Sequence, residues 1–166
     1  MSVVRSQNIG AFIHARSALV NTSITQSSAA AATTQDGITV DRNETGLGRY
    51  YSCKAIVSGA WTAGSSLQTA VVTLNFQHSS DGTSWDNFST ATVPSATFGA
   101  TSSGNAFGTT AGTAYQTVEQ SVNLNSARRY VRVQVPVPTF GDCSSGKSLA
   151  VAGVIVFGGA DTLPAV

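Results

Sequence analysis

Few residues of this chain have side chains that could perform catalytic or metal chemistry. Its 166 residues include two histidines, His14 and His78, and two cysteines, Cys53 and Cys143. No third ligand lies at metal spacing, and no His-x-x-x-His or Cys-x-x-Cys pair is present. We favour two buried, reduced thiols over a disulfide, which would require the fold to bring the cysteines together. The sequence therefore predicts no metal and no cofactor.

The acidic and serine residues also lack the arrangement that hydrolases need. A serine nucleophile on a sharp strand-to-helix turn requires Gly-x-Ser-x-Gly, which is absent. Glycoside hydrolysis needs two opposed carboxylates, but of the eight acidic residues only Glu119 lies within a predicted strand. Asp81 and Asp86 do not have the spacing of a calcium loop. We expect no catalytic residue, no small-molecule substrate and no enzymatic activity.

Two tryptophans leave one binding function open. Trp61 and Trp85 fall at a predicted strand end and in a predicted turn, where exposed rings could stack on sugars. The interpretation that we favour is that each ring closes one end of a hydrophobic core. A carbohydrate-binding or adhesin-like module is therefore the alternative function.

Charge is sparse and nearly balanced. Charged residues make up 10% of the chain, with a net charge of +1, against about a quarter in typical soluble domains. Arg128, Arg129 and Arg132 form too thin a cluster for a phosphate-binding surface, so we expect no nucleic-acid partner. No secretory signal or membrane-length apolar run is recognisable, so we expect no membrane partner. A surface rich in small polar residues is typical of a subunit that packs against others, and we expect a homo-oligomer, a trimer.

From residue 38 onward the hydrophobic pattern has the period of two that strands show. The alternating segments are residues 49–57 with Tyr51, Cys53, Ala55 and Val57 on one face, 68–78 with Val72, Leu74 and Phe76 facing in, 115–124, and 129–135. Residues 79–82 predict the turn of a hairpin whose second strand begins at Trp85. Residues 149–157 are apolar on both faces, which predicts a central strand covered on both sides.

These elements predict one all-β domain over residues 37–166, a β-sandwich or jelly roll of about eight antiparallel strands. Residues 1–36 predict an extended N-terminal arm that docks on the body or on a neighbour, with a weakly capped helix over residues 12–20 as a further interpretation. Residues 91–113 predict a long loop. The expected partner contacts are apolar residues of the arm and the loop: Val3, Val4, Ile9, Phe12, Ile13, Leu19, Val20, Phe98 and Phe107.

Three local patterns occur in an order that resembles the capsid cement (decoration) proteins of tailed bacteriophages. They are DGITVDR at residues 36–42, followed by a strand with YYS at residues 50–52; VTLNFQHSSDGTSW at residues 72–85; and ARRYVRV at residues 127–133, followed by an apolar strand that ends in VFGG. Together they extend over about residues 36–160, and each pattern alone is common in β-sandwiches.

The resemblance implies a jelly roll that sits on the outside of an assembled head and locks capsomers together, usually as a trimer. It implies that the partners are the major capsid protein and further copies of the chain, and that a protein made in the host cytoplasm ends on the exterior of the virion. Other virion components, such as tail or head-completion proteins, share these features. The resemblance identifies no contact residues.

Overall fold

The computed structural model describes residues 13–26, 32–43, 50–63, 69–88, 95–99, 112–141 and 147–160. Within these ranges the chain forms strands and no helix that is long and apolar enough to cross a membrane. The strands are β1 (Ile13–Gln26), β2 (Gln35–Asp36), β3 (Val40–Asp41), β4 (Tyr50–Ala63), β5 (Thr69–Thr73), β6 (Asn75–Ser79), β7 (Asp86–Asn87), β8 (Ser95–Gly99), β9 (Gly112–Asn123), β10 (Tyr130–Val135), β11 (Thr139–Gly141) and β12 (Lys147–Ala160).

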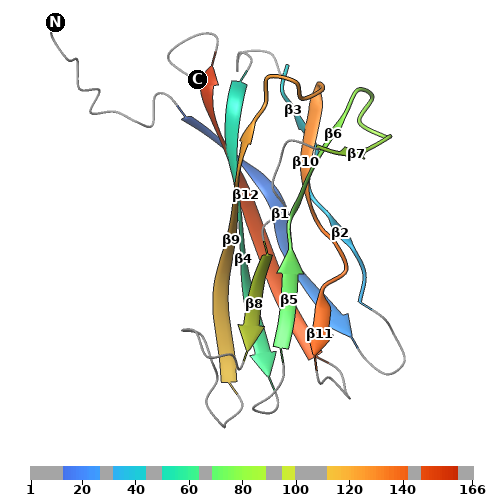
Figure 1. Ribbon diagram of the computed structural model, residues 1–166, viewed down its shortest axis with the longest axis vertical. Coiled ribbons are helices and arrows are strands. Elements are labelled where there is room, and N and C mark those ends of the chain that lie inside the picture. The colour runs from blue at the N-terminus through green and yellow to red at the C-terminus, as the bar shows by residue number, and fades with distance from the viewer. Residues whose placement is uncertain are drawn as a thin grey trace, which may run out of the picture.

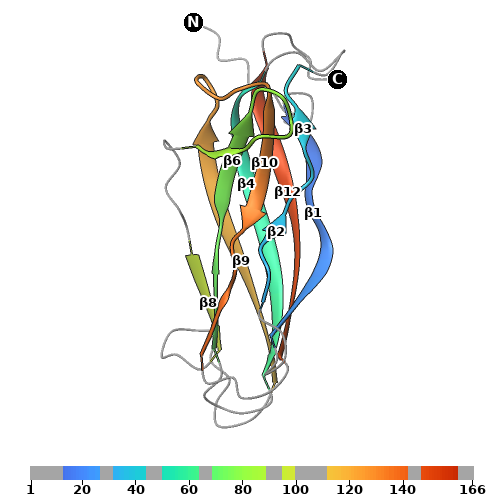
Figure 2. The same cartoon turned by 90° about the vertical axis from the view of Figure 1, so that its right-hand side faces the viewer.

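The strands form two layers that face each other (Figure 1). One layer is a four-stranded antiparallel sheet in the order β1-β12-β4-β9. The other combines the sheet β2-β10-β6-β7, with β3 also paired to β10, and the sheet β11-β5-β8. These two sheets are continuous, because only Leu74 separates β5 from β6 and only residues 136–138 separate β10 from β11. Figure 2 shows the resulting elongated sandwich from the side.

The strand order is that of a jelly roll. Joining β2 with β3, β5 with β6, β7 with β8, and β10 with β11 reduces the twelve described segments to eight strands. In chain order, one layer then reads first, eighth, third, sixth, and the other reads second, seventh, fourth, fifth. Two interleaved four-stranded layers of this kind are the jelly-roll arrangement. The prediction of an all-β jelly roll with about eight antiparallel strands is confirmed.

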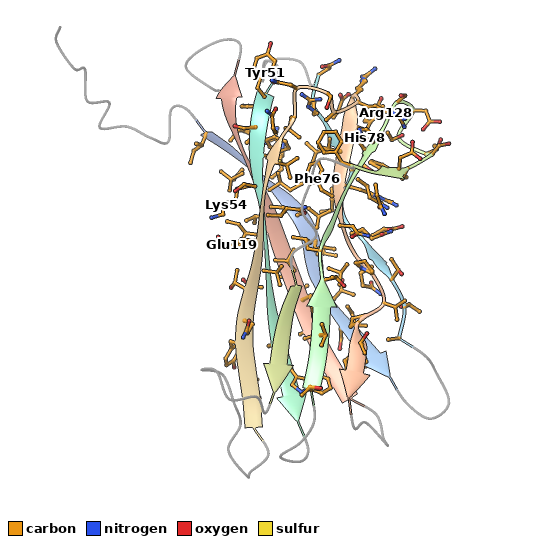
Figure 3. The ribbon with its side chains drawn as sticks, viewed as in Figure 1. Tyr51, Lys54, Phe76, His78, Glu119 and Arg128 are labelled. Carbon is orange, nitrogen blue, oxygen red and sulfur yellow. The ribbon has the colours of Figure 1, made fainter. Side chains whose placement is uncertain are left out.

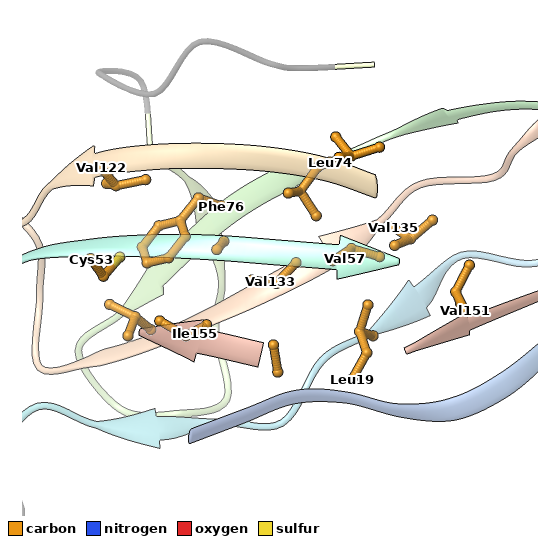
Figure 4. Close-up of a cluster of buried hydrophobic side chains, with 14 of the residues drawn as sticks. Leu19, Cys53, Val57, Leu74, Phe76, Val122, Val133, Val135, Val151 and Ile155 are labelled. Atoms are coloured by element: carbon orange, nitrogen blue, oxygen red, sulfur yellow. The ribbon is translucent and has the colours of Figure 1, made fainter. Parts of the chain in front are cut away.

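The hydrophobic core lies between the two layers (Figure 4). Val57 and Ile155 come from one layer, and Phe76 and Val133 from the other, each at most 2% exposed. The predicted inward faces of residues 68–78 and 129–135 are confirmed, because the apolar side chains assigned to them are at most 2% exposed. Burying one such side chain stabilises the fold by roughly 1.5–3 kcal/mol.

One prediction about side-chain direction is wrong. Tyr51 was expected to share the inward face with Cys53, but Tyr51 is 41% exposed and Tyr50 is 2% exposed. The Tyr50 ring packs against Phe157, with 5.4 Å between ring centroids. Alternation fails at this end of β4, where the consecutive residues Tyr51 and Ser52 are both exposed.

The predicted arm is corrected over part of its length. Ile13–Gln26 is the edge strand β1, which pairs with β12 from Ile13 opposite Gly158 to Gln26 opposite Lys147. It forms a strand and not the helix considered for residues 12–20. Of the two docking alternatives, this segment docks on its own body, because the ladder satisfies its backbone and Ile24 is buried. Residues 1–12 and 27–31 lie outside the described residues.

The predicted loop at residues 91–113 is also corrected at both ends. Residues 95–99 form β8, which pairs with β5 and places Phe98 opposite Ala70. Strand β9 already begins at Gly112. The small uncharged residues of this segment gave no alternating pattern, yet an edge strand needs only a partner for its backbone. Residues 100–111, and with them Phe107, lie outside the described residues.

The predicted hairpin joins β6 to β7 through a turn centred on Asp81. The Asp81 carboxylate accepts hydrogen bonds from the backbone N–H groups of Thr83 and Ser84 and from the Ser79 hydroxyl, each at 2.8 Å. Gly82 has a φ of 77°, which suits glycine. The backbone donors of Ser84 and Thr83 lower the pKa of Asp81 well below its ordinary value of 3.8, because they stabilise the ionised carboxylate.

This turn predicts an acid-sensitive contribution to stability. Because the folded-state pKa of Asp81 is depressed, its ionised form stabilises the protein above about pH 4, and this contribution is lost as the pH falls through the folded-state pKa. We expect Asp81→Asn to lower the free energy of unfolding at pH 7 and to differ progressively less from the parent protein below about pH 4. Urea unfolding over a pH series measures this. A difference that stays constant with pH would contradict the role of the charge.

Candidate interaction surfaces

The segment from Asp36 to Arg42 joins the two layers of the sandwich. The Gly37 N–H donates to the Val133 carbonyl at 2.7 Å, and the Ile38 N–H donates to the Ala18 carbonyl at 2.7 Å. These acceptors belong to β10 and β1, which are in different layers. A Cβ on Gly37 would lie no more than 2.5 Å from both carbonyl oxygens. Only glycine therefore fits between the two strands here.

Arg42 lies at the end of the same segment and is buried, at 3% exposure. Its guanidinium donates to the backbone carbonyls of Ala127, Arg128 at 3.1 Å, and Tyr50 at 2.8 Å. It thus connects the start of β4 to the loop between β9 and β10. A planar cation with five donors suits such a set of acceptors.

Charged side chains cover the outside of the sheet β2-β10-β6-β7 in a connected network. Asp36 accepts from Gln134 at 2.7 Å and forms an ion pair with Arg132 at 3.1 Å. The Arg132 guanidinium donates to Gln77 at 2.8 Å and lies over the Trp85 ring, 4.3 Å from its centroid. The partly buried charge of Arg132 is therefore compensated by a carboxylate, an amide oxygen and an aromatic ring.

The other two arginines of the predicted basic cluster are paired as well. Arg129 binds both carboxylate oxygens of Asp41, at 2.7 and 3.1 Å, and this hydrogen bonding lowers the pKa of Asp41. Arg128 forms an ion pair with Asp86 on the hairpin, near the His78 ring (Figure 3). Each of the three arginines is therefore paired with a carboxylate, and the basic charge of the cluster is neutralised.

The two tryptophans do not form a common platform for sugars. Trp61 is fully buried and stacks on Phe140, with ring centroids 5.2 Å apart, so it closes one end of the core as we favoured. The same interpretation is wrong for Trp85, which is half-buried and outside the core, with Arg132 over its ring. Because Trp61 is buried, a sugar could stack on only one of the two tryptophans, Trp85. The surface of two exposed tryptophans on which the sugar-binding alternative depended is therefore ruled out.

The histidines and Cys53 pack within the fold. His14 lies against the Tyr50 ring at 6.2 Å, and the His78 ring contacts Phe88 at 4.9 Å. Burial lowers the pKa of His78 and raises that of the free Cys53 thiol to about 12. Cys143 lies outside the described residues. Among the residues that the structure describes, no group of three or more His, Cys, Asp or Glu side chains could hold a metal ion.

The predicted partner contacts fall into three groups. Ile13 and Val20 on β1 are 41% and 63% exposed, so they are available to a partner. Leu19 lies opposite Gly153 and is 5% exposed, so most of its side chain packs in the core of its own domain. The side chain of Phe98 is outside the described set, as are four arm residues and one loop residue: Val3, Val4, Ile9, Phe12 and Phe107.

A second surface was missed as a site by sequence reasoning: the outward side of β1, β12, β4 and β9, which we call the outer sheet face. Its described residues include Ala15, Ser17, Lys54, Ile56, Ser58, Ala60, Thr62, Thr113, Tyr115, Thr117, Glu119, Ser121, Ala150, Ala152, Val154 and Val156. Lys54 and Glu119 form an ion pair on it (Figure 3). Residues 149–157 were expected to be covered on both sides. Strand β12 is central as predicted, but Ala152 and Val154 are exposed.

No protein-family model matches the chain, and no curated protein matches its sequence. Among solved structures, the chain is similar to the VP2 subviral particle of infectious bursal disease virus, with 9% identity, a TM-score of 0.44, and coverage of 87% of this chain and 32% of that chain. It is also similar to the structure of the Gx strain of that virus, with 10% identity, a TM-score of 0.48, and coverage of 93% of this chain and 35% of that chain. A third similar structure is that of deformed wing virus, a honeybee pathogen, with 8% identity, a TM-score of 0.35, and coverage of 92% of this chain and 49% of that chain. The chain spans less than half the length of each of these three chains.

Proposed function

We propose that this chain is a structural, non-enzymatic protein of a virus particle. More specifically, we propose a cement protein that is made in the host cytoplasm and binds the outside of an assembled bacteriophage head. Its partners are then the major capsid protein and further copies of itself, with a trimer as the expected assembly. The sequence resemblance and the jelly-roll strand order support this proposal.

The observation that carries the proposal is that the three sequence patterns of the resemblance meet in one structural unit. Asp36 of the first pattern pairs with Arg132 of the third at 3.1 Å, and Arg132 lies over Trp85 of the second. Asp41 and Arg129 join the first pattern to the third again. Patterns that are weak one by one are thus parts of a single interlocking set, which supports treating them as one signature.

Cementing follows from mass action. A protein that binds the assembled shell, and not its free subunits, adds its binding free energy to the stability of the shell. Repeated placement over a symmetric lattice adds avidity without requiring a strong single contact. A surface with few charges suits this role, because few ions must be desolvated when it is covered.

Deleting residues 2–12 tests the contribution of the N-terminal segment to head binding. This deletion removes Val3, Val4, Ile9 and Phe12 but leaves β1 intact, whereas a deletion extending to residue 34 would remove an edge strand of the sheet. We expect the full chain to co-sediment with heads of the phage that encodes it. The shortened chain should unfold at the same temperature and bind at least about tenfold more weakly, the loss of one or two apolar anchors.

A glycan array is the matched negative assay for that experiment. No retention on glycans is expected, either for the parent chain or for Trp85→Ala, while both should bind heads. Binding to glycans that Trp85→Ala abolishes, without binding to heads, would overturn the cement proposal in favour of a sugar-binding module.

A further inference from the structure

Strand β12 in the outer sheet face has a sequence that does not suit exposure to water. Its core-facing side chains are at most 2% exposed: Leu149, Val151, Ile155 and Phe157. The alternate residues are apolar as well, yet Val154 is 41% exposed and Ala152 is exposed. A strand with one side in water normally carries polar residues on that side. The outward side of β12 therefore has the composition of a covered surface.

Neighbouring strands extend this apolar strip and give it a polar border. The register places Val154 beside Ile56 of β4, and Ala150 beside Ala60. Toward β9 the face becomes polar, with cross-strand hydrogen bonds of 3.1 Å between the hydroxyls of Ser58 and Thr117 and of Thr62 and Thr113. An apolar centre with a polar rim is the usual anatomy of a protein–protein interface.

Charge on the outer sheet face is already neutralised. Among its described side chains only Lys54 and Glu119 are charged, and they form an ion pair with each other. Covering the face would therefore leave no charge unpaired, which is the costly outcome when ions are buried. A partner with a strong charge of either sign gains nothing here, whereas a second copy of the same face matches it.

The outer sheet face also carries a hollow and a side chain that can fill one. The hollow has a volume of about 260 Å³ and is lined by Leu19, Ile56, Ser58, Ala152, Gly153 and Val154. Tyr115 lies on β9, at the edge of the same sheet, and is 71% exposed. Tyrosine is among the residues that most often anchor interfaces, inserted into a pocket of the partner. The face therefore supplies both halves of such a contact.

The area of the face matches what a stable association needs. Strands β1, β4 and β12 have 14 residues and are each about 46 Å long, β9 with 12 residues is about 40 Å long, and the four side by side are about 19 Å wide. The resulting footprint is about 850 Å², and a standard interface buries about 800 Å² on each partner. One face of this sheet is thus large enough without help from other surfaces.

We propose that the outer sheet face binds a second copy of this chain, with Tyr115 of one copy in the hollow beside Gly153 of the other. Because the face pairs with the same face of the other copy, the expected assembly through it is a two-fold dimer and not the trimer that the resemblance implies. This inference names a surface for self-association and does not depend on a role in a virion. Val154 and Ile56 are then buried between copies, and the Ser and Thr residues toward β9 form the rim.

Light scattering on the eluate of a sizing column, at micromolar concentrations of the full chain, tests the proposal. The parent chain should be an oligomer, and Val154→Lys, which places an unpaired charge in the interface, should raise its dissociation constant at least about 30-fold. Tyr115→Ser should weaken association in the same direction. The matched control is Val137→Lys, since Val137 is 52% exposed and lies outside this face; it should leave the mass unchanged.

Circular dichroism should show that Val154→Lys keeps its β structure, because the substituted side chain points outward. A monomeric parent chain, or an oligomer that survives Val154→Lys, would overturn the proposal. If Val154→Lys abolishes the oligomer but Tyr115→Ser does not, the outer sheet face is the interface and the proposed contact of Tyr115 with the hollow is wrong. Head binding is measured separately, so failure to bind heads with self-association intact would count against the cement role alone.

Discussion

Replacing Gly37 with alanine should lower the free energy of unfolding by about 3 kcal/mol or more. The added Cβ would lie no more than 2.5 Å from the carbonyl oxygens of Val133 and Ala18. Both obstacles are backbone atoms of strands in opposite layers, and each accepts a hydrogen bond from this segment, so neither can move without disturbing that contact. For a domain of this size the melting temperature should fall by about 6–12 °C.

Gly158→Ala is the matched control for that substitution. A Cβ at Gly158 would meet only the Ser52 hydroxyl oxygen at 3.7 Å, which is an ordinary contact. Its melting temperature should stay within about 2 °C of that of the parent protein, since a change without a clash is usually small. Equal effects of the two substitutions would show that the narrow space at Gly37 is not what requires glycine there.

Arg42→Met should destabilise the protein by about 3 kcal/mol or more, because it removes charge-assisted hydrogen bonds to three backbone carbonyls. The methionine side chain fills part of the volume but leaves the carbonyls of Ala127, Arg128 and Tyr50 without this donor. Arg42→Lys should recover only part of the loss, because an ammonium cannot reach all three acceptors with the geometry of a guanidinium. Urea unfolding of the three proteins gives the comparison.

Arg129→Met controls for the loss of an arginine as such. Arg129 pairs with Asp41 at the surface, with half of its side chain exposed, and exposed ion pairs contribute about 1 kcal/mol at most. A loss with Arg129→Met as large as that with Arg42→Met would mean that burial and the carbonyl contacts of Arg42 are not the source of its effect.

The class of fold could be predicted from sequence because alternation of apolar residues is a direct consequence of strand geometry. Val72, Leu74 and Phe76 turn inward as their spacing requires, and the turn at Asp81 lies where its residue types predict it. Strand β1 could not be predicted in this way. Its burial is irregular, with adjacent Ala18 and Leu19 both buried, because register shifts interrupt its pairing with β12.

The interaction surface could be predicted only in part. Periodicity shows that residues 149–157 are apolar on both sides, but it cannot show whether a layer of the same chain covers the second side. The structure supplies that information, since only one side of β12 faces the core. The position of Arg42 is a further example. A lone arginine in a polar segment resembles any surface cation until the fold places three carbonyls around it.

The position of β12 between β1 and β4 has a consequence for how the protein is made. Among the described strands β12 is the last to be synthesised, yet both of its neighbours pair with it over most of their length. Until residues 147–160 have left the ribosome, β1 has no partner in this sheet and β4 has one open edge. Such contacts between segments distant in sequence fold slowly, in milliseconds to seconds, and open edges favour aggregation meanwhile. Folding of this layer therefore waits for late translation, and chains that stall before residue 147 would keep these edges open.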